Sequence, residues 1–276
     1  MTDRIPLAAV IGHPVAHSRS PKVHGHWLRR HGVRGYYIPM DVGAADLAEV
    51  LRTMPKMGFV GCNVTIPHKE TVLRIAQSVT DRAALIGAAN TITFRDDGSM
   101  QADNTDGFGF LENIRQAAPG WSPRNGPAAV FGAGGAARAV IVSLLDAGVP
   151  QIRLTNRSRG RAEALRQEFG AKVVVHDWVR AGNIVDDAVT VVNTTSLGME
   201  GKPAFRVPLD GLMPGAVVSD LVYTPLETDF LKAARSAGCI AVDGLGMLLH
   251  QAAPGFERWF GPRPEVDDDL RAATLA

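Results

Sequence analysis

The sequence predicts an α/β fold made of two α/β domains, and three observations support this prediction. Short apolar segments typical of strands alternate with helix-competent segments along most of the 276 residues. Residues 119–127 are rich in proline and glycine, interrupt the alternation, and indicate a joint between two units. A glycine-rich turn at 132–135 then links an apolar segment to a small-residue segment. Because alternating strands and helices favour parallel sheets covered on both faces, we expect one such sheet in each unit.

Apolar periodicity and turn residues give the expected order of elements. Before the joint, we expect strands at 7–11, 36–42, 59–65 and 90–94, and helices at 21–30, 46–54, 67–75, 81–86 and 108–117. After it, we expect strands at 128–131, 152–155, 172–175, 189–193, 217–221 and 239–242, and helices at 136–140, 161–169, 228–237 and 247–260. The last helix should return to the first unit, so the expected domains are 1–107 plus 244–276, and 108–243. A ligand cleft is expected between them, at the carboxyl ends of the strands.

Composition narrows the function classes. The chain is 46% hydrophobic and 21% charged with a formal net charge of +1, so nothing indicates nucleic acid or a membrane as a partner. No apolar run reaches the ~18 residues of a membrane span, and the first residues do not resemble a secretory leader. Cys62 and Cys239 lack metal or redox spacing. We therefore expect a cytoplasmic protein without a metal site.

The glycine-rich turn predicts a dinucleotide-binding unit of the Rossmann type. Gly132 permits the tight turn, Gly134 permits close backbone approach to a pyrophosphate, and Ala137 lets helix and strand pack closely. Free backbone N–H groups at the start of the helix would face the phosphates. An ordinary strand–helix turn is the alternative, and the strand before and helix after the glycines disfavour it.

The residues after the next predicted strand indicate the type of cofactor. An NAD site usually places an acidic residue about 20 positions beyond the glycines, whereas this chain has Arg157, Arg159 and Arg161 there and no carboxylate. A 2′-phosphate carries roughly two negative charges, and guanidinium groups bind it bidentately. We therefore expect NADP, with Arg157 and Arg161 as its clamp. A solvated basic turn is the alternative.

Two serines precede the first predicted helix. If this segment is extended, Ser18 and Ser20 face the same side while Arg19 faces away, so two hydroxyls at a helix N-terminus could hold a carboxylate. Ser20 also suits the N-cap position before Pro21. Carboxylate binding and helix capping are both open, and they are compatible.

Lys69 and Asp106 are further candidates. Lys69 is expected in the first turn of the helix at 67–75, where the helix dipole favours anions, and this inconsistency indicates a functional role. A surface lysine paired with Glu70 is the alternative. Asp106 either caps the helix that follows it or faces the cleft.

These features belong to a longer pattern that resembles the bacterial shikimate dehydrogenase family over nearly the whole chain. The matching segments, in that family's order, are His17-Ser18-Arg19-Ser20-Pro21, Asn63-Val64-Thr65-Ile66-Pro67-His68-Lys69, Ala89-Asn90-Thr91, Asn104-Thr105-Asp106-Gly107, the loop 132–137, Asn156-Arg157-Ser158, Asp220-Leu221-Val222-Tyr223-Thr224-Pro225, and Asp243-Gly244-Leu245-Gly246-Met247 with Gln251. Three positions depart from the pattern: His13 and Gly25, where the family often has Asn, and Ser158, where it often has Thr.

The resemblance implies a role for individual residues. Lys69 would be the catalytic acid/base, paired with Asp106. The substrate would contact Ser18, Ser20, Thr65, Asn90, Asp106, Tyr223 and Gln251. The cofactor NADP would contact Asp81, Gly132, Ala133, Gly134, Gly135, Ala136, Asn156, Arg157, Ser158, Arg161, Leu221 and Gly244.

The implied reaction is the reversible reduction of 3-dehydroshikimate by NADPH to shikimate, a step of the shikimate pathway of aromatic amino-acid biosynthesis. Lys69 would supply the proton to the reacting oxygen, a contribution typically worth about 10²–10⁴-fold. The implied partners are small molecules, and the protein would be a monomer or a homodimer. Two alternatives remain: an NAD-using quinate/shikimate dehydrogenase, which the arginines disfavour, and a catalytically silent NADP-binding regulator, which Lys69 and Asp106 disfavour.

Overall fold

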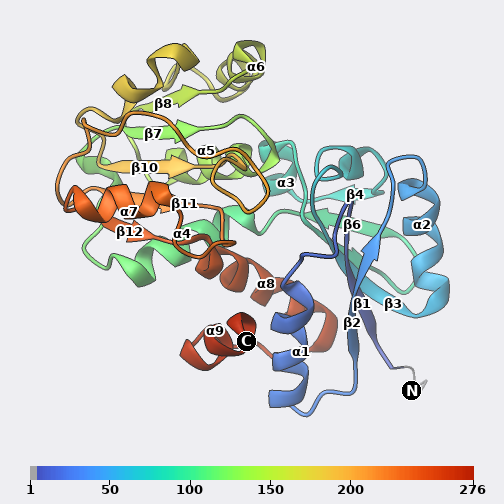
Figure 1. Cartoon of the computed structure of the whole chain (residues 1–276). Coiled ribbons are helices and arrows are strands. Elements are labelled where there is room, and N and C mark those ends of the chain that lie inside the picture. Colours follow the sequence, from blue (N-terminus) through green and yellow to red (C-terminus); the bar gives the residue numbers. More distant parts are fainter. Residues whose placement is uncertain (1–4) are drawn as a thin grey trace. The chain divides into compact units, whose positions relative to one another are not determined.

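A computed structural model describes residues 5–276, which fall into two compact units (Figure 1). The first unit runs to Gly109 and resumes at Leu248, and the second comprises Phe110–Met247. The sequence placed these limits at 107/108 and 243/244. Two α/β units are therefore present, as the alternation of strands and helices predicts.

The first unit contains a six-stranded mixed sheet with the strand order β2-β1-β3-β5-β6-β4. Its strands are β1 (Leu7–Gly12), β2 (Tyr36–Asp41), β3 (Phe59–Val64), β4 (Ser78–Val79), β5 (Thr91–Phe94) and β6 (Met100–Asp103). The expectation of a purely parallel sheet is wrong here, because β5 runs antiparallel to both β3 and β6. The short turn at 95–99 joins β5 to β6 as a hairpin, which leaves no room for a crossover helix.

The helices of the first unit pack on both sides of its sheet. They are α1 (Ser20–Arg30), α2 (Leu47–Thr53), α3 (Asp81–Ile86), α9 (Asp268–Leu275) and the short 3-10 helices η1 (Met54–Met57) and η2 (Thr71–Arg74). Successive residues of β1 face opposite sides, and Ala9 and Ile11 pack in one core cluster with Leu47 and Leu51 of α2. Two further helices, α4 (Asp106–Ala117) and α8 (Gly244–Phe260), begin in one unit and end in the other.

The second unit contains a six-stranded sheet in which every pair is parallel. Its strands are β7 (Ala128–Phe131), β8 (Ile152–Thr155), β9 (Val173–His176), β10 (Thr190–Asn193), β11 (Val217–Asp220) and β12 (Ile240–Val242). The spatial order β9-β8-β7-β10-β11-β12 is the 3-2-1-4-5-6 order of the Rossmann fold (Figure 1). The prediction of a Rossmann-type unit is confirmed.

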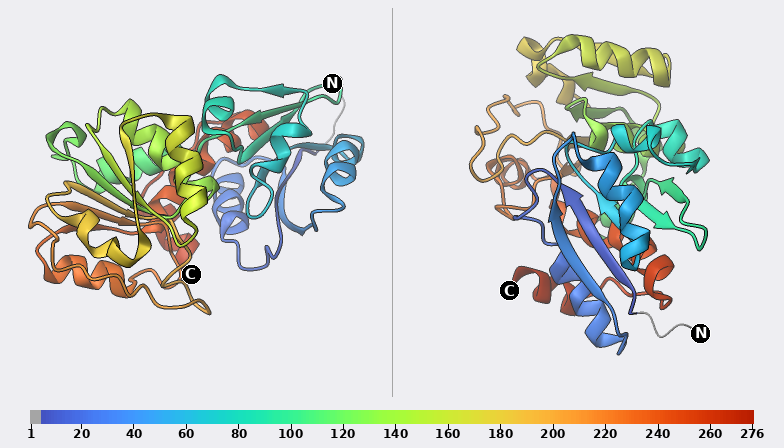
Figure 2. Two further views of the ribbon diagram at one scale, coloured as in Figure 1. Left: turned by 90° about the horizontal axis from the view of Figure 1, so that it is seen from above. Right: turned by 90° about the vertical axis from the view of Figure 1, so that its right-hand side faces the viewer.

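Helices cover both faces of this parallel sheet (Figure 2). Helices α4, α5 (Gly135–Asp146) and α6 (Arg159–Phe169) pack in the cluster on one face, and α7 (Asp229–Ser236) and the 3-10 helix η4 (Trp178–Val185) in the cluster on the other. The short 3-10 helix η3 (Pro123–Asn125) has no buried residue. Alternate residues of β7 face opposite sides of the sheet: Ala128 and Val130 pack in one apolar cluster, and Ala129 and Phe131 pack in the other. Strands buried on both faces explain why these segments are continuously apolar in the sequence.

Two expectations about helix starts are wrong. Arg19, not Ser20, is the N-cap of α1 and adopts a helical conformation, so residues 18–20 are not extended. Lys69 lies in a turn before η2, since no α-helix forms at 67–75. The helix-dipole argument for Lys69 therefore fails, and its position must be judged from its contacts.

Candidate functional site

Lys69 and Asp106 meet in the first unit although 37 positions separate them in the sequence. The Lys69 ammonium donates to Asp106 Oδ2 at 2.5 Å. The lysine side chain is 16% exposed and the aspartate side chain 5%, so the pair is shielded but not sealed from solvent. Asp106 is the first residue of α4, and its backbone N–H is held by Asn104 Oδ1 at 3.0 Å. The carboxylate is thus free to face the lysine rather than to cap its own helix.

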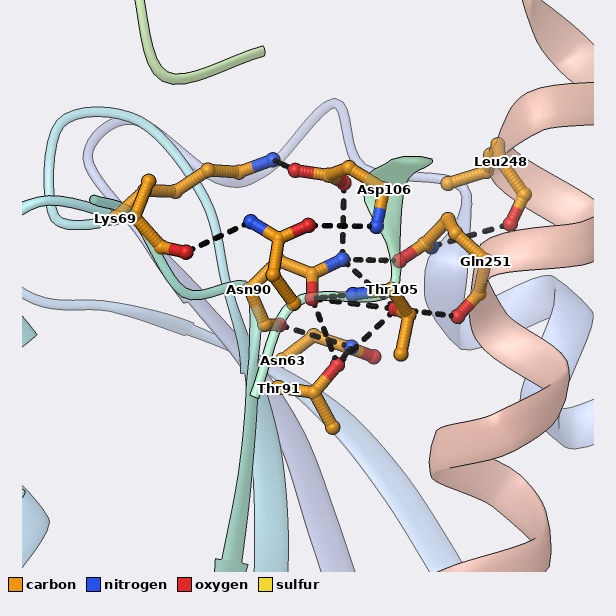
Figure 3. A network of polar contacts seen from close by, with 10 residues as sticks. Asn63, Lys69, Asn90, Thr91, Thr105, Asp106, Leu248 and Gln251 are labelled. Atoms are coloured by element: carbon orange, nitrogen blue, oxygen red, sulfur yellow. Dashed lines mark hydrogen bonds and ion pairs between the residues drawn. The ribbon is translucent and has the colours of Figure 1, made fainter. Parts of the chain in front are cut away.

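Asn90 lies at the centre of the polar network around this pair (Figure 3). Its amide nitrogen lies 2.9 Å from Asp106 Oδ1 and 2.8 Å from Gln251 Oε1. Its amide oxygen accepts from the backbone N–H of Thr105 at 2.8 Å and from the Thr91 hydroxyl at 2.9 Å. The two oxygens of Asp106 therefore have different donors, the lysine on one side and the asparagine on the other.

Gln251 and Thr105 attach helix α8 to this network. The Thr105 hydroxyl donates to the backbone oxygen of Gln251 at 2.8 Å, and the Gln251 amide nitrogen donates to the backbone oxygen of Leu248 at 3.1 Å. Both residues are almost fully buried. The predicted site residues Lys69, Asn90, Asp106 and Gln251 are therefore brought together by the structure (Figure 3).

The predicted substrate-binding residues Ser18, Ser20 and Thr65 differ in their surroundings. Ser20 is buried in the first turn of α1, and its backbone N–H donates to the Ser18 hydroxyl at 3.3 Å. Arg19 is directed to α9, where it donates to the backbone oxygen of Thr274 at 3.0 Å. Thr65 follows β3 and is half-buried, and its backbone N–H donates to the backbone oxygen of Ile11 at 2.9 Å. Ser18 thus contributes to the helix start, and binding of a carboxylate by the two serines stays a prediction.

The Lys69–Asp106 pair is suited to moving a proton. An ammonium has three N–H donors, and the bond to Asp106 uses one, which leaves two for an incoming oxygen. A buried carboxylate held by two donors fixes the direction of the lysine side chain. Positioned donors of this kind stabilise negative charge that develops on a reacting oxygen.

The glycine turn of the second unit has the geometry expected of a pyrophosphate site. Gly132 follows β7 with φ +112°, and a Cβ there would lie 2.4 Å from Thr194 Oγ1, so the turn requires glycine. Gly134 is the N-cap of α5, and a Cβ at Gly134 would meet no atom within 4 Å. Open space beside a helix N-terminus, next to the strand-order reversal between β7 and β10, fits a dinucleotide phosphate.

Two more predicted cofactor residues, Leu221 and Gly244, follow β11 and β12. Gly244, at the start of α8, lies so close to Leu221 that a Cβ would be 2.4 Å from the Leu221 backbone oxygen. Tyr223 follows two positions after Leu221. The structure therefore brings Leu221 and Gly244 together. Asp81 begins α3 of the first unit and is exposed, and its contact with a cofactor stays a prediction.

The arginines after β8 are not equivalent. Arg159 is paired with both Asp177 and Glu163. Arg157 and Arg161 are exposed, and within residues 5–276 neither guanidinium has an ion-pair partner. Asn156 donates to the backbone oxygen of Ser158 at 2.8 Å and so shapes the turn. The two arginines that the sequence assigns to a phosphate are the two that remain available for one.

Sequence reasoning missed a second buried carboxylate, Asp220, at the end of β11. Its oxygens accept from the Thr228 hydroxyl at 2.6 Å, from Asn193 at 2.9 Å and from the Val222 backbone N–H at 3.0 Å. Burial raises the pKa of Asp220 to about 6 despite these donors. An aspartate directly after an apolar strand was the available signal, but it gave no indication of the partners.

Membrane spans and metal clusters are both absent from the described residues. Within the part of the chain that the structure describes, no helix is long and apolar enough to cross a membrane. Among the same residues, no group of three or more His, Cys, Asp or Glu side chains is arranged to hold a metal ion.

Comparison with known proteins identifies similar sequences over the full length. The family described as the shikimate dehydrogenase substrate binding domain matches residues 10–92, and the shikimate 5′-dehydrogenase C-terminal domain matches residues 244–274. A shikimate dehydrogenase (NADP(+)) of Cereibacter sphaeroides is 72% identical over 273 residues, covering 99% of this chain and 98% of its own. That of Paracoccus denitrificans is 69% identical over 271 residues, covering 98% of this chain and 96% of its own.

Two solved structures of lower sequence identity are similar to this chain over nearly its full length. The shikimate 5-dehydrogenase of Thermus thermophilus, in complex with NADP(H) and shikimate, is 36% identical with a TM-score of 0.88, covering 98% of this chain and 99% of its own. The quinate dehydrogenase of Corynebacterium glutamicum, in complex with NAD, is 31% identical with a TM-score of 0.89 and the same coverage.

Proposed function

Because the chain belongs to the shikimate dehydrogenase family, we propose that it catalyses the reversible, NADPH-dependent reduction of 3-dehydroshikimate to shikimate. One observation carries the chemical part of this proposal: an ammonium group, Lys69, is bonded to a buried carboxylate, Asp106, inside a satisfied polar network. Reduction of a ketone requires a proton donor at the oxygen, and Lys69 would act as that donor.

In the proposed reaction, Lys69 acts on the substrate oxygen and Asp106 holds the ammonium in position. When bound, NADPH supplies the hydride for the carbonyl carbon. Lys69 stabilises the negative charge that develops on the oxygen and transfers a proton to it. In the reverse direction, the neutral lysine accepts the hydroxyl proton. The two donors that bind Asp106, Lys69 and Asn90, keep its side chain in place during the reaction.

The remaining site residues are assigned to binding. Ser18 and Ser20 would hold the substrate carboxylate, while Thr65, Asn90, Tyr223 and Gln251 would contact the ring hydroxyls. The turn at Gly132–Ala136 would take the pyrophosphate, supported by the open space beside Gly134. Asn156, Ser158, Arg157 and Arg161 would take the 2′-phosphate, which supports NADP over NAD.

A steady-state assay with 3-dehydroshikimate and quinate, each with NADP(H) and NAD(H), tests the proposal. We expect kcat/KM to be highest for the shikimate pair with the phosphorylated cofactor. Equal kcat/KM values for NADPH and NADH would remove the cofactor assignment. Efficient quinate oxidation with NAD would favour the alternative, an NAD-using quinate/shikimate dehydrogenase. The similarity to the Corynebacterium glutamicum enzyme supports this alternative. A folded protein that binds NADPH without turnover would instead be a regulator.

A cytoplasmic monomer or homodimer completes the proposal. Cys62 and Cys239 are both free thiols, which fits a reducing compartment. Sedimentation of the purified protein measures the oligomeric state, and a larger assembly would contradict this part of the proposal.

A further inference from the structure

Tyr37 connects an aromatic cluster of the first unit to the polar network described above. It lies on β2, is 8% exposed, and donates its hydroxyl to Asn63 Oδ1 at 2.7 Å. The preceding residue, Tyr36, is 61% exposed, as expected for neighbours on one strand. Tyr37 belongs to none of the motifs that indicate the function.

The direction of this hydrogen bond is fixed by chemistry. Asn63 Nδ2 lies 3.1 Å from the backbone oxygen of Asn90 and 3.3 Å from the Thr91 hydroxyl. Because a carbonyl oxygen can only accept, the amide must turn its nitrogen toward Asn90 and its oxygen toward Tyr37. The phenol must therefore donate, and without it the buried Asn63 oxygen would lose its donor.

The phenol is held rigidly and remains protonated. Its ring stacks on His24 with centroids 3.9 Å apart and an interplanar angle of 5°. Burial lowers the pKa of His24 to about 3, so this stacking partner is a neutral ring. Burial also raises the pKa of Tyr37 well above its usual value, and the opposing effect of the Ser20 side chain is smaller. A neutral, stacked phenol keeps one orientation.

We infer that Tyr37 is a positioning residue for the reaction: its hydroxyl orients Asn63, Asn63 fixes the backbone of Asn90, and Asn90 holds Asp106 beside Lys69. The inference rests on the proposed function and adds to it a residue that is not among those assigned to substrate or cofactor. Each link in this chain is a direct contact of 3.1 Å or less between buried or half-buried groups. Loss of the first link leaves a buried acceptor unsatisfied, which favours rotation of the Asn63 amide.

Comparison of Tyr37→Phe with Tyr36→Phe tests the inference. Both changes remove one hydroxyl from neighbouring tyrosines, but only the first removes a donor from the network. For Tyr37→Phe we expect kcat for 3-dehydroshikimate reduction to fall about tenfold, since the loss of one buried hydrogen bond has effects of this order. The Kd for NADPH should stay at the wild-type value, and Tyr36→Phe should match the wild type in every parameter.

A double-mutant cycle separates positioning from general destabilisation. If Tyr37 acts through Asn63, Tyr37→Phe should have little further effect on kcat in an Asn63→Ala background, or in Asn63→Ser if the alanine variant does not fold. Additive effects, or wild-type kinetics of Tyr37→Phe, would overturn the inference while leaving the proposed function intact. Absence of turnover by the wild-type chain would overturn the proposed function and the inference with it.

Discussion

The two units form their polar sites in different ways. In the first unit, Lys69, Asn90, Asp106 and Gln251 are bonded to one another, so their functional groups already have partners. In the second unit, the proposed phosphate site is formed by the backbone around Gly132 and the start of α5.

The arginines of the second unit extend this contrast. Arg157 and Arg161 have no ion-pair partner within residues 5–276, so they would gain one only when an anion arrives. Hydrogen bonds within the protein keep the side chains of the first-unit network in one arrangement. Arginines without such partners instead contribute to the free energy of binding when an anion is bound. Changes in the first unit should therefore alter turnover, and changes in the second should alter cofactor affinity.

Lys69→Ala gives the largest expected effect and tests the first half of this contrast. We expect kcat for 3-dehydroshikimate reduction to fall by about 10²-fold or more, because the substitution removes the proposed proton donor. The Kd for NADPH should change little. Steady-state kinetics and fluorescence titration of NADPH measure the two quantities.

Glu70→Ala is the matched control, since Glu70 is the exposed neighbour of Lys69 in the same turn. It should leave both kcat and Kd at the wild-type values. A mild loss of kcat with a large increase in the cofactor Kd for Lys69→Ala would mean that the lysine serves binding, and the contrast between the units would collapse.

The same difference explains what the sequence could predict. The parallel strands of the second unit and the glycine turn are recognisable because each depends on local pattern: continuous apolar segments and a glycine required by backbone geometry. The first unit was predicted less well. Strands β4 and β6 were missed, because Ser78–Val79 and Met100–Asp103 show no clear alternation and form by pairing with each other.

The contacts of the first-unit site could not be predicted because they are non-local. Asn90 meets Gln251, which lies 161 positions away, and only the folded chain selects this pairing. The argument from the residues alone selected Lys69 because it assumed a helix at 67–75, and the structure has no α-helix there. Ser20 was predicted to cap α1, yet the Ser18 hydroxyl accepts its backbone N–H. Propensity identified the residues but not their roles.

Asp220→Asn tests an exception to the contrast, since Asp220 lies in a buried side-chain network within the second unit. Its folded pKa of about 6 lies above the usual unfolded value of ~3.9. The carboxyl therefore favours folding at pH below ~4, and this contribution is lost as the pH rises through about 6. Between pH 4.5 and pH 7.5 the wild type should lose roughly 2 kcal/mol of stability relative to Asp220→Asn.

Urea unfolding of both proteins at pH 4.5 and pH 7.5 measures this difference, and contributions from other titrating groups cancel in it. A difference that does not vary with pH would show that Asp220 is not strained when ionised. If Asp220→Asn changed kcat rather than stability, a side-chain network of the second unit would also affect turnover. The contrast between the two units would then be wrong.

The double variant Arg157→Ala with Arg161→Ala has the smallest expected effect and tests whether the open anion site is specific. We expect the Kd for NADPH to increase about tenfold while the Kd for NADH stays unchanged, because only NADPH offers the 2′-phosphate. Arg159→Ala is the control for the two single variants, Arg157→Ala and Arg161→Ala, since it removes the same single charge from the same segment but from a guanidinium already bonded to Asp177 and Glu163. If Arg159→Ala weakened NADPH binding as strongly as either single variant, the turn would act by its summed charge alone. In that case 1 M salt should abolish the cofactor preference, because screening removes such long-range attraction but spares direct hydrogen bonds.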